Sequence, residues 1–255
     1  MASNRGGGGG IIYSENHDAI SISNSKFDNV SSAASGGVIL SEKGQNTISI
    51  TGCNFTEVSS GASGGVVRYS NSKSILNIDN CNFINCHSKD VKVAGDTNVY
   101  GGGAVCVPSS KDITHTIKDS HFINCTSALA GGAIYERAGT VNIDNCEFEK
   151  CDAKQGSAIY TGDSSSLSTN SKTTISNSKF TDNNANDAAI YLGSALTNGA
   201  TISNCNFIDN RGVSANDIYY TPRATSTRIT INDNTFNGEN HIYIRGAADI
   251  IRNHE

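Results

Sequence analysis

The chain repeats one short motif from end to end, and phenylalanine marks each copy. All eight phenylalanines fall at the same point of the repeat. They are Phe27, Phe55, Phe83, Phe122, Phe148, Phe180, Phe207 and Phe236. Five residues before each stands an isoleucine: Ile22, Ile50, Ile78, Ile117, Ile143, Ile175, Ile202 and Ile231. Self-similarity at a period of about thirty residues is typical of solenoids, and no other feature limits the fold as strongly.

Two polar positions and a second motif complete the repeat. Asn, Asp or Gly stands three residues before each phenylalanine, and a small side chain stands two residues before it. In four copies this small residue is a cysteine: Cys53, Cys81, Cys146 and Cys205. The motif Gly-Gly-Ala-Ile-Tyr at 131–135 precedes the repeat, and its glycines disappear in later copies. We therefore divide the chain into an N-terminal segment 1–8, a repeat array 9–244 and a C-terminal tail or cap 245–255.

The repeat predicts short strands instead of helices. Segments such as Ile20-Ser-Ile22 alternate apolar and polar residues, as half-buried strands do. Asn, Asp or Gly before the Cys/Ser position accepts a left-handed backbone and turns the chain onto a new wall. Two or three such strands per turn predict an all-β fold, a single-stranded right-handed parallel β-helix of about eight to nine coils. Coils about 4.8 Å apart place isoleucine on isoleucine and phenylalanine on phenylalanine.

The composition excludes several classes of protein. Apolar residues make up 36 % of the chain and tryptophan is absent, which suits a narrow solenoid. The net charge is −5 without long runs of either sign, so we expect neither nucleic-acid binding nor attraction to an anionic membrane. No apolar run approaches the roughly 20 residues of a membrane span. The N-terminus, in which Gly6 to Gly10 follow a polar start, carries no apolar segment typical of a secretory signal.

The paired motifs resemble a known family. Phe180-Thr-Asp-Asn183 and Phe207-Ile-Asp-Asn210 match the Phe-x-x-Asn motif, and Gly131-Gly-Ala-Ile matches its partner motif. In three copies cysteine replaces the asparagine: Cys86, Cys125 and Cys151. Repeats of this kind mark the chlamydial polymorphic membrane proteins and related surface proteins. The resemblance implies the β-helical passenger of an autotransporter-type adhesin displayed at a cell surface. Unpaired cysteines also fit an intracellular site, so the localisation stays open.

The eight cysteines leave three interpretations. Zinc requires convergent ligands, whereas cysteines at one repeat position point in parallel and alternate with Ser or Asn. Disulfides between adjacent coils are compatible with the allowed Cα separation. Reduced thiols that pack as small buried groups account best for the exchange with Ser and Asn. We therefore expect no metal and no other cofactor.

A catalytic site is the least favoured alternative. Asp182 and Asp209 both follow their phenylalanine by two residues and would lie about 5 Å apart on adjacent coils, a separation compatible with a retaining glycosidase. The same position carries Asn29, Glu57 or Lys150 in other copies, which indicates a polar corner. His115 occupies a position that is apolar in other copies, so we expect it to be partly buried. The chain is therefore predicted not to be an enzyme.

Two insertions, residues 87–100 and 162–172, interrupt the array and are the natural contact elements of a solenoid. The first predicts a binding loop made of Lys89, Asp90, Lys92, Asp96, Asn98 and Tyr100. The favoured function is a non-catalytic, adhesin-type binding rod with a protein partner. The alternative is a structural solenoid that stacks end to end or docks in a larger assembly, because the repeat begins by residue 9 without a recognisable cap.

Overall fold

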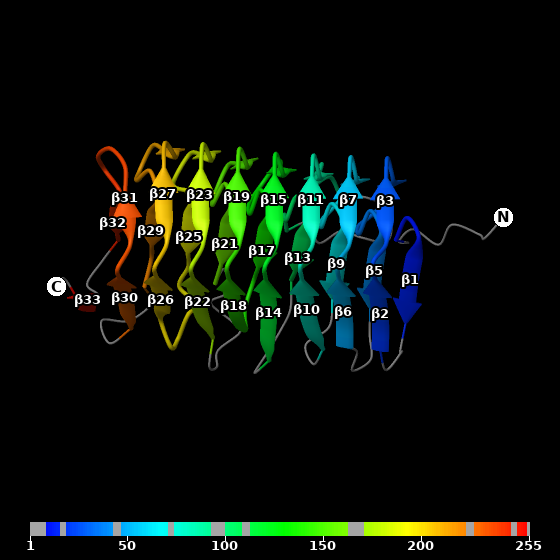
Figure 1. Ribbon diagram of the computed structural model, residues 1–255, viewed down its shortest axis with the longest axis horizontal. Coiled ribbons are helices and arrows are strands. Elements are labelled where there is room, and N and C mark those ends of the chain that lie inside the picture. The colour runs from blue at the N-terminus through cyan, green and yellow to red at the C-terminus, as the bar shows by residue number, and fades with distance from the viewer. Residues whose placement is uncertain are drawn as a thin grey trace.

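The chain folds into a rod of stacked coils with strands on four walls (Figure 1). The structure, a computed structural model, describes residues 9–15, 19–42, 47–70, 74–92, 100–108, 113–162, 171–222, 227–245 and 249–253. These residues contain strands and no helix. All strand pairs are parallel, and each strand pairs with its equivalent in the next coil. The first and last described strands therefore lie at opposite ends of the rod in Figure 1.

Two walls contain nine strands each. Wall A follows the Gly-Gly-Ala motif and consists of β1 (Ile12–Glu15), β5 (Ile39–Glu42), β9 (Val67–Ser70), β13 (Val105–Val107), β17 (Ile134–Glu136), β21 (Ile159–Thr161), β25 (Ile190–Leu192), β29 (Ile218–Tyr220) and β32 (Ile242–Ile244). Wall B contains the isoleucine position and consists of β2 (Ala19–Ser23), β6 (Thr47–Thr51), β10 (Ile75–Asp79), β14 (Thr114–Lys118), β18 (Thr140–Asp144), β22 (Lys172–Ser176), β26 (Ala200–Ser203), β30 (Arg228–Asn232) and β33 (Asp249–Asn253).

The other two walls are built from shorter strands. Wall C carries the phenylalanines on β3 (Lys26–Asp28), β7 (Asn54–Thr56), β11 (Asn82–Ile84), β15 (His121–Ile123), β19 (Glu147–Glu149), β23 (Lys179–Thr181), β27 (Asn206–Ile208) and β31 (Thr235–Phe236). Wall D consists of two-residue strands: β4 (Ser31–Ser32), β8 (Ser59–Ser60), β12 (His87–Ser88), β16 (Thr126–Ser127), β20 (Asp152–Ala153), β24 (Asn184–Ala185) and β28 (Arg211–Gly212).

The number of walls differs from the sequence-based prediction. Two or three strands per coil were expected, and the structure has four. Wall D escapes prediction because two residues are too few to show the period-two alternation by which a strand is recognised. The predicted stacking of like residues is confirmed: Ile22 pairs with Ile50, Ile50 with Ile78, and so on to Ile231.

The phenylalanines form one continuous column inside wall C. Successive rings lie parallel, with centroids 4.7 to 5.0 Å apart from Phe27 to Phe236. The six inner rings are fully buried, and the two end rings are partly buried. Aromatic pairs of this kind contribute about 0.5–1.5 kcal/mol each beyond the burial of their area. The column therefore couples each coil to the next and is a main element of the core.

The corners between walls use left-handed backbone conformations. The residue three before each phenylalanine has a positive φ in every copy, for example Asn145 at 50° and Gly52 at 64°. This confirms the predicted turn between walls B and C. A second column of positive φ lies two residues after the phenylalanine, between walls C and D, and includes Asn29, Glu57 and Asp182. Glutamate lacks the local hydrogen bonding that lets Asn adopt this conformation easily, so Glu57 is strained.

Replacing Glu57 with Asn is expected to stabilise the rod. The variant keeps the corner at a φ of 53° and removes part of a cost of about 1 kcal/mol for a non-glycine residue in the left-handed region. The measurement is the free energy of unfolding by denaturant. The matched control is Asn29→Glu at the equivalent corner of the first coil, which should destabilise by a similar amount. Equal stability of all three proteins would contradict the strain.

The cysteines form hydrogen-bonded columns along the rod. Two residues before phenylalanine, side chains accept the N–H of their equivalents in the preceding coil: Cys81 Sγ from Cys53 (3.4 Å), Ser178 Oγ from Cys146 (3.1 Å) and Asn234 Oδ1 from Cys205 (2.8 Å). The same side chains donate to backbone carbonyls, as Cys81 does to Asp79. Cys, Ser and Asn interchange in this column because each is small and can both donate and accept.

A second column explains the Phe-x-x-Asn motif and its cysteine variants. Asn183 Oδ1 accepts the N–H of Cys151 (2.9 Å), and its Nδ2 donates to the carbonyl of Phe148 (3.0 Å). The thiol of Cys151 makes the corresponding contact to Phe122 (3.5 Å). All eight cysteines are buried, and no disulfide joins the seven that lie outside wall A. Burial raises the pKa of Cys81 to about 11 and that of Cys146 to about 12, so these thiols stay protonated at neutral pH.

His115 places an imidazole in the interior of the rod. His115 was expected to be partly buried, and it is 1 % exposed. Its Nδ1 accepts the N–H of Leu76 (3.0 Å), and its Nε2 lies 3.9 Å from Glu136 Oε2, which is also buried. The Tyr69 ring packs edge-on against the imidazole at 6.2 Å. Burial lowers the pKa of His115 to about 4, so the imidazole is neutral at pH 7.

His115 should make the rod less stable in mild acid. A pKa lowered from 6.5 to about 4 means that the unfolded chain binds the proton first, so stability falls as the pH drops from 6.5 towards 4. The expected loss is about 3 kcal/mol relative to His115→Val, which carries the residue of the next coil at this position. Denaturant unfolding at pH 7, 5.5 and 4.5 measures it. Parallel pH profiles of the two proteins would contradict the neutral imidazole.

The predicted boundaries fall as follows. His87 and Ser88 of the first insertion form β12 within wall D, and Lys172 of the second begins β22 in wall B. Residues 93–99 and 163–170 lie outside the described residues, as does the predicted N-terminal segment 1–8. Beyond residue 244, β33 pairs with β30 and continues wall B. The parallel stacking of coils therefore extends into the segment that was predicted to be a tail or cap.

Candidate functional site

The outer face of wall A carries a column of tyrosines. In each coil the residue after the inward-facing Ile or Val points outward: Tyr13, Leu40, Arg68, Cys106, Tyr135, Tyr160, Tyr191, Tyr219 and Tyr243. The last five rings stack with centroids 4.4 to 5.3 Å apart. Because neighbouring rings occupy each other's faces, the column presents ring edges and hydroxyl groups to its surroundings.

The five stacked tyrosines are covered at the N-terminal end of their stack. Tyr135 and Tyr160 are 2 % and 4 % exposed, whereas Tyr191 and Tyr219 are half-buried and Tyr243 is 43 % exposed. Tyr100 lies near Tyr135 with ring centroids 5.8 Å apart, and the guanidinium groups of Arg68 (5.8 Å) and Arg137 (5.4 Å) lie close to its ring. Cation–π contacts with both arginines hold this ring in place. The accessible part of the tyrosine stack therefore begins near Tyr191.

The predicted binding loop does not behave as one exposed element. Lys89 and Lys92 are exposed, but Asp90 forms a corner with a φ of 53°. Its Oδ2 accepts hydrogen bonds from Ser127 Oγ (2.6 Å) and from the N–H of Leu129 (3.1 Å). Burial raises the pKa of the Asp90 carboxyl, and these hydrogen bonds partly offset the increase. Asp90 and Tyr100 are thus packed against the rod, and Asp96 and Asn98 lie outside the described residues.

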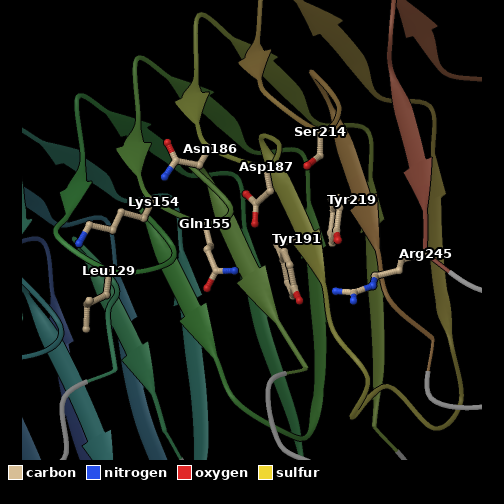
Figure 2. Close-up of a pocket in the computed structure, with 9 residues that line it drawn as sticks. All are labelled: Leu129, Lys154, Gln155, Asn186, Asp187, Tyr191, Ser214, Tyr219 and Arg245. Atoms are coloured by element: carbon tan, nitrogen blue, oxygen red, sulfur yellow. The ribbon is translucent and has the colours of Figure 1, made fainter.

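A groove of about 490 Å³ lies along the accessible tyrosines (Figure 2). Its lining comes from successive coils, so it runs in the direction of the rod axis. Figure 2 shows the edges of Tyr191 and Tyr219 on one side and polar residues of the D-to-A corners on the other. The lining residues are Leu129, Lys154, Gln155, Asn186, Asp187, Tyr191, Ser214, Tyr219 and Arg245.

Asp187 organises the polar side of the groove. It replaces the first glycine of the Gly-Gly-Ala motif and is 7 % exposed. Its Oδ1 accepts the N–H groups of Gly156 and Ala188, both at 2.8 Å, while its Oδ2 is buried with no hydrogen bond. Burial raises the pKa of this carboxyl, and the two N–H groups and the Gln155 side chain lower it. The aspartate therefore supports the corner, and the lysine and arginine supply the exposed charge of the lining.

The candidate catalytic pair lies elsewhere. Asp182 and Asp209 are exposed and occupy left-handed corners between walls C and D, each with a φ of 54°. Asp209 Oδ1 accepts a hydrogen bond from Asn237 (3.3 Å). Neither residue lines the groove. In the described part of the chain, no three His, Cys, Asp or Glu side chains gather as a metal ion would require.

The geometry defines the class of protein: a right-handed parallel β-helix with a groove on one outer wall. The family model for a right handed beta helix region matches residues 102–254, and the chain belongs to that family. No curated protein and no solved structure matches the chain. Among the described residues, no helix has the length and apolar character that a bilayer crossing requires.

One feature of the sequence, the repeated tyrosine, indicates this site. Tyrosine follows isoleucine in five successive copies from Tyr135 to Tyr243, and equal repeat positions stack. The column was therefore predictable. Its partners were not, because Lys154, Ser214 and Arg245 come from corners and strand ends of different coils.

Proposed function

We propose that this protein is a non-catalytic binding protein of the adhesin type, and that the groove beside Tyr191 and Tyr219 receives a protein partner. The tyrosine column carries the proposal. Tyrosine and arginine are the residues most enriched at the energetic centres of protein interfaces, where rigid aromatic groups lose little entropy on binding. Stacking holds Tyr191 and Tyr219 in place before a partner arrives, at 5.2 Å from each other.

Charge indicates the kind of segment that the groove would receive. Lys154 and Arg245 stand at separate points of the lining, while the carboxylate of Asp187 is turned into the corner. An extended segment with acidic side chains complements this arrangement, and it would lie along the rod axis. The similarity to polymorphic membrane proteins supports the same function. A polysaccharide-active enzyme has less support, because Asp182 and Asp209 serve as backbone corners.

Binding to intact cells tests the proposal. Fluorescently labelled protein should bind cultured epithelial cells saturably, and mild protease treatment of the cells should abolish the binding. The double variant Lys154→Glu/Arg245→Glu should weaken binding about tenfold or more, as expected for charged residues at an interface centre. The matched control is Lys26→Glu, an exposed charge reversal on wall C, which should bind as the parent does.

Either of two results would contradict the proposal. Equal affinity of the parent and the groove variant would exclude the groove as the binding surface. Binding that survives protease treatment would exclude a protein partner. Unfolding curves of all variants show whether a loss of binding reflects a loss of structure.

End-to-end association is a second candidate, supported by the first coil. Its core residues Ile12, Ile20, Ile22, Phe27 and Val30 are partly buried, whereas their equivalents in the second coil are fully buried. Within the described residues, β1 to β4 each pair with one neighbouring strand. Unpaired strand edges over an apolar core are surfaces on which further strands can add.

Electron microscopy over a hundredfold range of concentration tests this association. If copies stack, the rods should lengthen with concentration, and Phe27→Lys should abolish the lengthening by placing a charge on the end of the phenylalanine column. Rods of one length at all concentrations would contradict the stacking candidate and leave the binding function unaffected.

A further inference from the structure

The groove places one cation on either side of a pair of tyrosines. Lys154 lies before β21, and Arg245 follows β32. Tyr191 and Tyr219 belong to β25 and β29, the two strands between β21 and β32 in wall A. Along the rod the order is therefore a cation, two tyrosines and a second cation, as Figure 2 shows.

This order fits an extended segment that runs along the rod. Strands of a sheet lie about 4.8 Å apart, so the three spacings from β21 to β32 amount to about 14 Å. An extended chain advances about 3.3 Å per residue, and about four residues cover this distance. Side chains two residues apart point to the same side of such a chain. Residues i and i+4 can therefore face Lys154 and Arg245, while residue i+2 faces the tyrosines between them.

The centre of the groove favours an uncharged ring. Tyr191 and Tyr219 stack with centroids 5.2 Å apart and present their edges to the groove. A ring whose face lies on both edges makes two edge-to-face contacts, a geometry that aromatic pairs prefer. Asp187 lines the same stretch, and its carboxylate would repel a third acidic side chain. The groove therefore selects for an aromatic residue at position i+2 and against an acidic one.

The protein itself contains a ring in a comparable place, at the other end of the tyrosine stack. Tyr100 stands two residues before the first glycine of its motif, the corner position that Lys154 occupies in a later coil. Its ring lies 5.8 Å from the ring of Tyr135. The guanidinium group of Arg137 lies 5.4 Å from the centre of the Tyr100 ring, and its Nη1 donates to the hydroxyl group (3.4 Å). A ring that comes from the corner thus packs against this column beside an arginine.

Arg137 and Arg245 occupy the same repeat position. They follow Tyr135 and Tyr243, respectively, by two residues. The backbone N–H of each arginine donates to a carbonyl of the preceding coil. Arg245 is exposed and lines the groove, and a guanidinium group can stack on a ring and also pair with a carboxylate. Arg245 is therefore placed to contact a partner's ring as Arg137 contacts Tyr100.

We propose that the groove recognises an extended segment of the partner with an aromatic residue at its centre and an acidic residue two positions away on each side. Lys154 and Arg245 bind the two carboxylates, and the edges of Tyr191 and Tyr219 bind the ring. This pattern rests on the proposed function of the groove and defines which segments the groove accepts. Spacing, and not acidity alone, decides the affinity.

Three fluorescently labelled peptides test the pattern. The first, Gly-Glu-Ser-Tyr-Ser-Glu-Gly, has both glutamates two positions from the tyrosine. The second has alanine in place of the tyrosine, and the third, Gly-Ser-Glu-Tyr-Glu-Ser-Gly, has the composition of the first with the glutamates next to the tyrosine. Fluorescence anisotropy measures their binding to the intact protein. The second should bind about tenfold more weakly than the first, as expected for a central aromatic anchor. The third should bind about fivefold more weakly, as expected for the loss of two exposed ion pairs.

The variant Lys154→Gln/Arg245→Gln should bind the first and third peptides equally, because it lacks both cations. The control Lys26→Gln removes an exposed charge from wall C and should keep the preference for the first peptide. Equal binding of all three peptides by the parent would overturn the pattern and leave a groove for acidic segments in general. No binding of the first peptide at about 1 mM would also overturn it. Loss of cell binding together with an intact peptide preference would contradict only the adhesin function.

Discussion

Parallel pairing of the backbone along the rod axis is the constraint on which the whole structure depends. Each strand hydrogen-bonds to its equivalent in the next coil, so every side chain lies directly above the same position of the repeat. A residue type that stacks well on itself is therefore favoured at each inward position. The phenylalanine column, with ring centroids 4.7 to 5.0 Å apart, follows the strand spacing and belongs to one hydrophobic core that runs along the rod.

The same constraint determines which polar residues are tolerated inside. A buried side chain next to a corner forms hydrogen bonds with the backbone of the preceding coil. Cys81, Ser178 and Asn234 accept a backbone N–H of that coil at one position. At another position Asn183 and Cys151 donate to a carbonyl of that coil. The cysteines are thus members of hydrogen-bonded columns, and their exchange with serine and asparagine follows from shared geometry. The buried polar side chains stabilise the rod, and the candidate binding groove lies on an outer wall.

Departures from the repeat coincide with the polar features of the outer surface. Asp187 stands where other copies have glycine, and its carboxylate supports the groove corner. His241 stands at the alanine position of the Gly-Gly-Ala motif, and its Nδ1 lies 2.6 Å from Asp217 Oδ2. Tyr100 is the last residue of the first insertion and covers the tyrosine column beside Arg68 and Arg137. Regular copies of the repeat specify the rod. Departures from the repeat supply polar and charged groups on its outer surface.

The sequence by itself determined the solenoid, the isoleucine and phenylalanine columns and the left-handed corner before the Cys/Ser position, because repetition turns one local pattern into the whole fold. The tyrosine column was also within its reach, since Tyr135 to Tyr243 share one repeat position. Only the tertiary structure decided the fourth wall, whose two-residue strands carry no periodicity. It also decided the packing of Asp90 and Tyr100, the lining of the groove and the contact of His241 with Asp217. These features join residues at unequal positions of different coils, and no repeat pattern specifies such neighbours.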